Sequence, residues 1–361
     1  MQLTEAQLAA YERDGFLVVK DVFSAEDLDR FQKRFIDIVE RRVRPSDGLL
    51  VMRDAMVAKK AVTTSAPEKA IAKLQMFQKD PVLNDYIQHE GLLDCVQQLI
   101  GSKDLKMVHN MLINKPPGLK DPETGVVIGG RHPIHQDLLY FTDRPPEHIC
   151  ATWTALQDID RTNGCLVVIP GSHRGLNGEG PTLYTHSPPE WRYLNTAYWG
   201  VRDLPDGWKA KRLHVVMKRG ETVFFHPLLL HGSGRNRTDG FRRAISAHYA
   251  DTKCVIVKDI RRDTALMYGE LGGQMWRSKA RGPLGKGLSV ALAAALTAIV
   301  RRVYPQLSKL GSAGFFLGAA LILAELLRRL PTPEYQIGKY LYRFGARGNH
   351  VVVRGKARIR S

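Results

Sequence analysis

The sequence predicts a mainly β fold with flanking helices, followed by a helical, basic C-terminal extension. Residues 107 to 257 are short apolar runs separated by Gly, Pro and Asn, which is typical of antiparallel strands. Residues 3 to about 110 carry apolar residues at helical spacing, and residues 277 to 361 are rich in Lys and Arg. We expect the strand-rich part to form a double-stranded β-helix, a jelly-roll barrel of the cupin type.

The N-terminal region is expected to be mainly helical. Ser24 and Asp27 stand at the spacing of an N-terminal capping box. Apolar residues then recur at helical spacing: Leu28, Phe31, Phe35, Ile38 and Val39. This stripe is predicted to pack on the outside of a sheet.

Two imidazoles and one carboxylate stand in a pattern that suits a metal ion. His135 and Asp137 are two residues apart, so on a strand both side chains point to one face. His231 comes from a distant apolar strand that ends in a glycine turn. Two His and one carboxylate hold one face of a non-haem Fe(II) and leave its other positions open. A satisfied structural histidine is the alternative for His135 on its own.

Arg242 follows His231 by eleven residues, beyond a turn rich in Gly and Asn. A guanidinium there can hold a carboxylate through two parallel hydrogen bonds. Strand alternation places Ala244, Ser246 and His248 on the same face as Arg242, and His248 is expected to be structural. Iron and a carboxylate clamp together predict an Fe(II)/2-oxoglutarate oxygenase. His132, three residues before His135, is expected on the opposite strand face and not as a ligand.

Over roughly residues 3 to 276 the chain resembles the phytanoyl-CoA dioxygenase family. The matching stretches occur in order and with fitting separations: residues 111–117, 131–138, 153–155, 163–168, 170–173 and 222–246. The resemblance implies an oxygenase domain over residues 1–276, with residues 277–361 as an extension that the family lacks. Residues 175 to 211 are interpreted as an insertion near the mouth of the barrel, with a role in covering substrate.

The resemblance also implies a role for individual residues. His135, Asp137 and His231 match the iron ligands, and Arg242 matches the arginine that binds the C5 carboxylate of 2-oxoglutarate. Further positions match the lining of the 2-oxoglutarate pocket: Lys73, Met111, Gln136, Trp153 and Ser233. An exposed lysine on a helix is the alternative for Lys73, and a core aromatic is the alternative for Trp153.

The implied reaction is 2-hydroxylation of phytanoyl-CoA or a similar branched fatty acyl-CoA, a step of fatty-acid alpha-oxidation. The implied cofactor is Fe(II), with 2-oxoglutarate and O2 as cosubstrates and ascorbate as an optional addition. Related halogenases carry a small residue where Asp137 stands, so the carboxylate favours hydroxylation. Two alternatives stay open: an oxygenase of the same fold acting on another small molecule, and a non-catalytic membrane-tethered scaffold.

Charge is distributed unevenly along the chain. Residues 277 to 361 hold sixteen Lys and Arg and two acids, Glu325 and Glu334, so they carry +14 of the formal +17. The oxygenase part is therefore close to neutral, and no nucleic-acid partner is expected. The four cysteines form no Cys-x-x-Cys pair, which suggests neither a zinc site nor a disulfide framework.

Two apolar runs, 288–300 and 310–327, lie in the basic extension. The first is short for a membrane span, which needs about 20 residues, and the second is marginal. Their basic flanks suit helices on an anionic membrane, so contact through residues 288–330 is one interpretation. A soluble helical pair with solvated basic ends is the other. The resemblance implies a peroxisomal location, although neither end shows a recognisable targeting signal.

Overall fold

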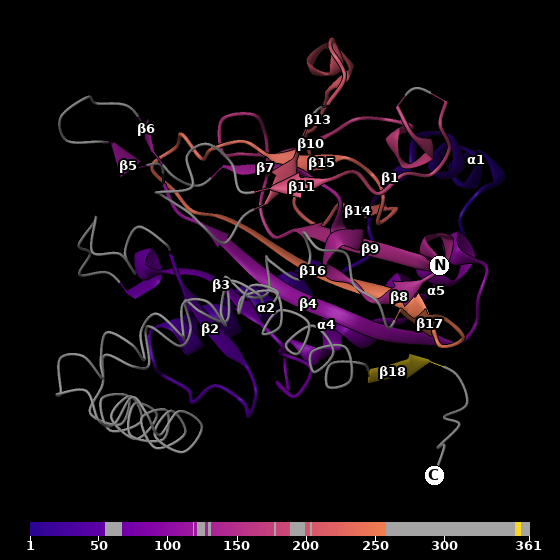
Figure 1. The fold of residues 1–361 in the computed structure, drawn as a ribbon. Coiled ribbons are helices and arrows are strands. Elements are labelled where there is room, and N and C mark those ends of the chain that lie inside the picture. The colour runs from indigo at the N-terminus through magenta and orange to yellow at the C-terminus, as the bar shows by residue number, and fades with distance from the viewer. Residues whose placement is uncertain are drawn as a thin grey trace, which may run out of the picture. The chain divides into compact units, whose positions relative to one another are not determined.

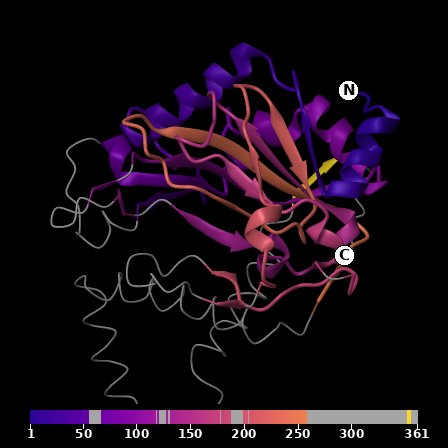
Figure 2. The ribbon, with the colours of Figure 1, turned by 90° about the horizontal axis from the view of Figure 1, so that it is seen from above.

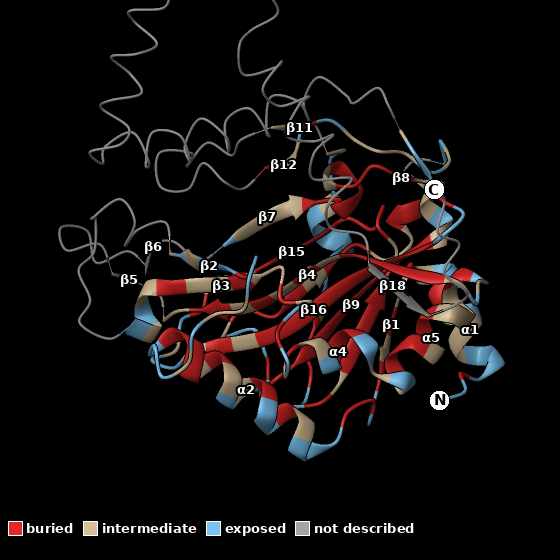
Figure 3. Ribbon diagram, turned by 90° about the horizontal axis from the view of Figure 1, so that it is seen from below, coloured by how far each residue is buried: buried red, intermediate tan, exposed pale blue. Residues whose placement is uncertain are grey.

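The computed structural model describes residues 1–54, 67–117, 119–120, 127–128, 131–176, 178–187, 199–202, 204–257 and 351–354. Within them, helices and antiparallel sheets form layers (Figure 1). The N-terminal indigo helices run along one side of the strands in Figure 2. Figure 3 shows α2, α4 and α5 on one side of the larger sheet and the strands β7 and β15 on the other.

The larger sheet has eight strands, and the pairings between them are antiparallel. Its order is β1 (Phe16–Val19), β14 (Thr222–Phe225), β9 (Ile149–Ala155), β16 (Arg242–Asp251), β4 (Leu105–Lys115), β3 (Ile71–Gln75) and β2 (Leu50–Arg53), with β18 (Val351–Arg354) on β4. The four-stranded sheet has the order β13 (Leu213–Val215), β10 (Leu166–Val168), β15 (His231–Ser233) and β7 (His132–His135). Two-stranded pairs are β11 (His186–Ser187) with β12 (Gly200–Val201), β17 (Val255–Ile256) with β8 (Asp143–Arg144), and β5 (Leu119–Lys120) with β6 (Val127–Ile128).

The helices lie mainly before the long strand β4. They are α1 (Glu5–Asp14), α2 (Ala25–Val39), α4 (Asn84–Gln88) and α5 (Glu90–Ile100). Short 3-10 helices are η1 (Pro67–Ala70), η2 (Asp137–Tyr140), η3 (Pro146–His148), η4 (Ser172–Arg174) and η5 (Trp208–Lys211). The predicted start of α2 is confirmed, because the Ser24 hydroxyl accepts the Asp27 N–H at 3.1 Å. Its predicted apolar stripe is buried.

The expectation of a mainly helical N-terminal region is wrong in part, because this region also supplies β1, β2 and β3. Strand β1 pairs with β14, and Phe16 lies opposite Phe225. Such a strand is stabilised by a partner far away in the chain. The local pattern of apolar residues is therefore a weak predictor of it.

The two faces of the larger sheet bury separate apolar clusters. On β16, Ile245, Ala247 and Tyr249 pack with the helices, whereas Ala244 packs with residues of the smaller sheet such as Val168. The predicted alternation along this strand is therefore confirmed. It directs Arg242 and His248 into the space between the two sheets, where the Arg242 guanidinium lies over the Trp153 ring.

The basic extension lies outside the described residues, apart from β18, as does the predicted domain boundary at residue 276. Among the described residues, no helix combines the length and the apolar character needed to cross a bilayer. The predicted membrane contact through residues 288–330 stays a prediction.

A buried ion pair joins helix α2 to the segment between β3 and α4. The Arg34 guanidinium contacts both oxygens of Asp80, with Nη2 at 2.8 Å from Oδ2. The Asp80 side chain is fully buried and also accepts the Leu83 N–H and the Ser46 hydroxyl. Burial raises the pKa of Asp80, but Arg34 and the backbone N–H groups lower it by more. The pKa of this carboxyl therefore lies below its usual value.

Replacing Asp80 with Ala should destabilise the protein by about 3–5 kcal/mol, because the Arg34 charge would be left buried without its partner. The matched control is Asp158→Ala, which removes an ion pair to Lys218 whose side chains are 63% and 77% exposed. Water and salt already screen that pair, so the control should unfold close to the wild-type denaturant concentration. Urea unfolding followed by circular dichroism measures both variants, and similar midpoints for the two would contradict the prediction.

Candidate metal centre

Two neighbouring strands of the smaller sheet bring the predicted ligands together. His135 ends β7 and His231 begins β15, and the two residues are register partners with ring centroids 4.3 Å apart. Asp137 starts the 3-10 helix η2, so the prediction that it lies on the same strand as His135 needs correction. The strand ends at His135, two residues before Asp137, but Gln136 keeps an extended backbone (φ −123°, ψ 128°). His135 and Asp137 therefore still project to one side.

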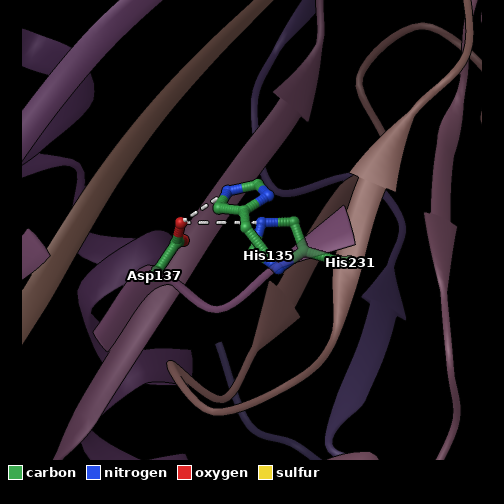
Figure 4. A group of neighbouring side chains, drawn as sticks. All are labelled: His135, Asp137 and His231. Carbon is green, nitrogen blue, oxygen red and sulfur yellow. Dashed lines mark ion pairs between the residues drawn. The ribbon is translucent and has the colours of Figure 1, made fainter. Parts of the chain in front are cut away.

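The three side chains converge on one point (Figure 4). Asp137 Oδ1 lies 3.2 Å from His135 Nε2 and 3.6 Å from His231 Nε2. All three residues are buried, and their candidate ligand atoms lie within 4.8 Å of one another. Two imidazole nitrogens and one carboxylate oxygen are the donor set of a non-haem Fe(II) site, so these residues fit that metal.

Backbone carbonyls set the orientation of both imidazoles. His135 Nδ1 lies 3.0 Å from the Pro133 carbonyl, and His231 Nδ1 lies 3.0 Å from the Leu229 carbonyl. A carbonyl only accepts, so each Nδ1 carries the proton and each Nε2 lone pair faces the centre. Burial lowers the pKa of His231 to about 4, so this imidazole is neutral near pH 7 and ready to act as a ligand.

Asp137 is an anion held among imidazoles. Burial raises its pKa, but the surrounding imidazoles of His231, His248 and His135 lower it more, to well below the usual range. Its second oxygen, Oδ2, lies 2.7 Å from His248 Nε2 on the larger sheet. The sequence did not predict this contact, although it placed His248 on the same strand face as Arg242.

A buried cationic site, centred on Arg242, lies on the same strand as His248. Arg242 is 2% exposed, and its guanidinium carbon lies 5.2 Å from the centroid of the Trp153 ring. Its register partner on β4 is Lys115, which is also buried. Lys115 Nζ donates to Ser233 Oγ at 2.8 Å and to the Gly234 carbonyl at 2.6 Å. Burial and the charge of Arg242 lower the pKa of Lys115 well below its usual value.

Lys115 was missed as a site residue, although it stands in the family-like stretch 111–117. Lys115 reaches the site because it pairs with Arg242 across strands β4 and β16. This pairing depends on how the strands align in the sheet, which local spacing in the sequence does not specify. The predicted residues Arg242, Trp153 and Ser233 are thus linked, directly or through Lys115.

The remaining predicted pocket residues lie on nearby elements. Lys73 is half-buried on strand β3, not on a helix, and burial lowers its pKa to about 8. Met111 on β4 lies opposite Ser246 of β16, whose hydroxyl faces the Met111 carbonyl at 3.4 Å. Contact of Lys73 and Met111 with 2-oxoglutarate stays a prediction.

Gln136 uses its side chain to hold two loops. Its Nε2 donates to the Thr182 and Leu228 carbonyls at 2.8 Å, and its Oε1 accepts the Tyr184 N–H at 2.8 Å. Part of the predicted insertion, residues 175–211, therefore lies beside the strand that carries the ligands. The pocket-lining role of Gln136 and the covering role of the insertion stay predictions.

The predicted orientation of His132 is wrong. Its ring stacks on His135 with centroids 4.2 Å apart and an interplanar angle of 28°. Strand β7 has one more residue than β15 between the pairs His135–His231 and His132–Ser233. Such a bulge breaks the alternation of side chains, so residues three apart come to the same side.

Comparison with known proteins identifies the relatives of this chain. The family described as phytanoyl-CoA dioxygenase (PhyH) matches residues 11–244. A probable phytanoyl-CoA dioxygenase of Caenorhabditis elegans is 45% identical over 252 residues, covering 69% of this chain and 76% of that protein. The peroxisomal phytanoyl-CoA dioxygenase of Homo sapiens is 44% identical over 253 residues, covering 70% of each chain.

The fold agrees with a solved structure. EctD from S. alaskensis with bound Fe aligns with a TM-score of 0.50 and 21% identity, covering 70% of this chain and 79% of that chain. This likeness shows the shared arrangement of antiparallel sheets with helices, the double-stranded β-helix of 2-oxoglutarate oxygenases, as the sequence predicted. The chain belongs to the phytanoyl-CoA dioxygenase family and is an iron- and 2-oxoglutarate-dependent dioxygenase.

Proposed function

We infer that this chain hydroxylates C2 of phytanoyl-CoA or a similar branched fatty acyl-CoA. The products would be the 2-hydroxyacyl-CoA, succinate and CO2: one oxygen atom of O2 enters the C2–H bond and the other enters succinate. The observation that carries the chemistry is the convergence of His135, Asp137 and His231. The buried Arg242 is in register with Lys115, which donates to Ser233 on the strand that begins with His231. The substrate class is supported by the 43–45% identity to proteins named phytanoyl-CoA dioxygenase.

His135, Asp137 and His231 would hold the iron. When bound there, Fe(II) supplies the activation of O2 that organic side chains cannot provide. The chain itself contributes the preoriented imidazoles and the anionic carboxylate described above. Their burial keeps bulk water from the reacting atoms.

Arg242 would bind the C5 carboxylate of 2-oxoglutarate, with the Trp153 ring covering its guanidinium. Ser233 would donate its hydroxyl proton to the same carboxylate. Its oxygen already accepts a hydrogen bond from Lys115 Nζ, so the hydroxyl proton is directed elsewhere. The buried Arg242 guanidinium gives a local field that favours an anionic ligand, and Lys115 adds N–H donors in register on the neighbouring strand.

A peroxisomal location is part of the proposal, because mammalian relatives at 43–44% identity are named peroxisomal. The fatty acyl-CoA would be the principal small-molecule partner.

Phytanoyl-CoA should stimulate succinate formation from 2-oxoglutarate by the Fe(II)-loaded full-length chain. Asp137→Ala should lose this turnover, since it removes the single anionic ligand of the three, and circular dichroism checks that the variant is folded. Product analysis by mass spectrometry should place the new hydroxyl on C2. Slow succinate formation that no branched acyl-CoA stimulates would reject the substrate and favour another small molecule. Absence of turnover in an iron-loaded wild type would overturn the proposal.

Arg242→Lys should raise the KM for 2-oxoglutarate at least about 30-fold, because losing a buried, hydrogen-bonded charge contact costs about 2 kcal/mol or more. The change keeps a positive charge but loses the paired N–H groups. Arg243→Lys is the matched control: Arg243 pairs with Glu68 and Asn114 on the other side of the strand. Its KM for 2-oxoglutarate should stay near the wild-type value. Equal KM values for the two variants would remove Arg242 from the carboxylate site.

A further inference from the structure

We propose that His248 is a positioning residue that keeps Asp137 bound to the metal through one carboxylate oxygen only. This inference rests on the proposed metal site. The two oxygens of Asp137 have different surroundings: Oδ1 faces the Nε2 atoms of His135 and His231 at 3.2 and 3.6 Å. Oδ2 faces away from them and lies 2.7 Å from His248 Nε2. One oxygen is thus directed to the metal position and the other is held by a hydrogen bond.

This division matters because coordination positions are limited. A carboxylate can bind a metal through one oxygen or through both, and the second mode uses one more position. The two-His-one-carboxylate arrangement works because it leaves positions open for the cosubstrates. By occupying Oδ2, His248 opposes the two-oxygen mode and keeps a position available.

The hydrogen-bonding capacity of His248 agrees with this role. An ionised carboxylate only accepts, so Nε2 must donate to Asp137. His248 Nδ1 is buried and makes no hydrogen bond within the described residues. If the proton were on Nδ1, it would be a buried N–H without an acceptor among the described residues. The Nε2–H tautomer avoids this cost. Aromatic rings surround the imidazole, with Phe141 at 4.8 Å and Phe225 at 6.5 Å between centroids.

The backbone under His248 is rigid and specifically shaped. His248 lies inside the larger sheet, with register partners His109 on β4 and Ala151 on β9. The pairing of β16 with β4 shifts register directly after His248, and such bulges re-aim side chains near functional sites. The imidazole is 3% exposed. Asp137 is thus fixed from the larger sheet, while both histidine ligands come from the smaller one.

The test compares His248→Leu with His248→Gln in the full-length chain, using Co(II) as a spectroscopic substitute for iron. His248→Leu removes the donor, and Gln can present an amide N–H to the same oxygen. The leucine variant should bind Co(II) about 10–100-fold more weakly, as is typical when such a supporting partner is lost. Its Co(II) absorption spectrum should also change, because the carboxylate can then turn its second oxygen to the metal. The glutamine variant should recover much of both properties.

His226→Gln is the matched control, because it removes another partly buried imidazole that packs on His173 and not on Asp137. It should keep wild-type affinity and spectrum. Wild-type affinity and spectrum in His248→Leu would overturn the inference, as would equal losses in the leucine and glutamine variants. Failure of the wild type to bind Co(II) would instead overturn the metal site itself, so the two failures are distinguishable.

Discussion

The buried carboxylate of Asp137 is the charge on which the site depends. Taking an anion out of water costs several kcal/mol unless nearby groups replace its hydration. Here the His248 Nε2–H faces one oxygen, and the other lies beside the Nε2 atoms of His135 and His231, where a bound metal cation would balance the charge. Each imidazole comes from a different strand, so the charge is stabilised only when both sheets are assembled. The metal centre and the packing of the fold are therefore formed together.

The same logic governs the cationic site. Arg242 and Lys115 are buried and in register, so burial and the guanidinium charge both disfavour a second positive charge on Lys115. The Trp153 ring and the Ser233 and Gly234 oxygens offset part of this cost. The carboxylate proposed to bind at Arg242 would add an opposite charge to this site. The two sites are reached from one face of strand β16. His248, near one end of that face, contacts Asp137, and Arg242, at the other end, forms the cationic site.

The sequence was informative where function depends on local spacing. The His135-x-Asp137 pair and the alternation of Arg242 and His248 follow from the period of an extended chain, and the apolar stripe of α2 follows from helical spacing. Contacts that depend on strand register were not predictable in this way. The hydrogen bonds from His248 to Asp137 and from Lys115 to Ser233 join residues more than a hundred positions apart. The error at His132 has the same origin, since a single extra residue in β7 reverses the expected face.

The segment that carries the ligands also connects the centre to its surroundings. Gln136 lies between His135 and Asp137, so alternation turns it away from the metal position. Its side chain holds residues Thr182 and Tyr184, and its N–H donates to His186 Nε2 at 3.0 Å. A displacement of residues 182–186 would therefore act on the backbone between His135 and Asp137, two proposed metal ligands. One face of this short segment presents His135 and Asp137 to the proposed metal position. The other face presents Gln136, which is hydrogen-bonded to Thr182 and Tyr184.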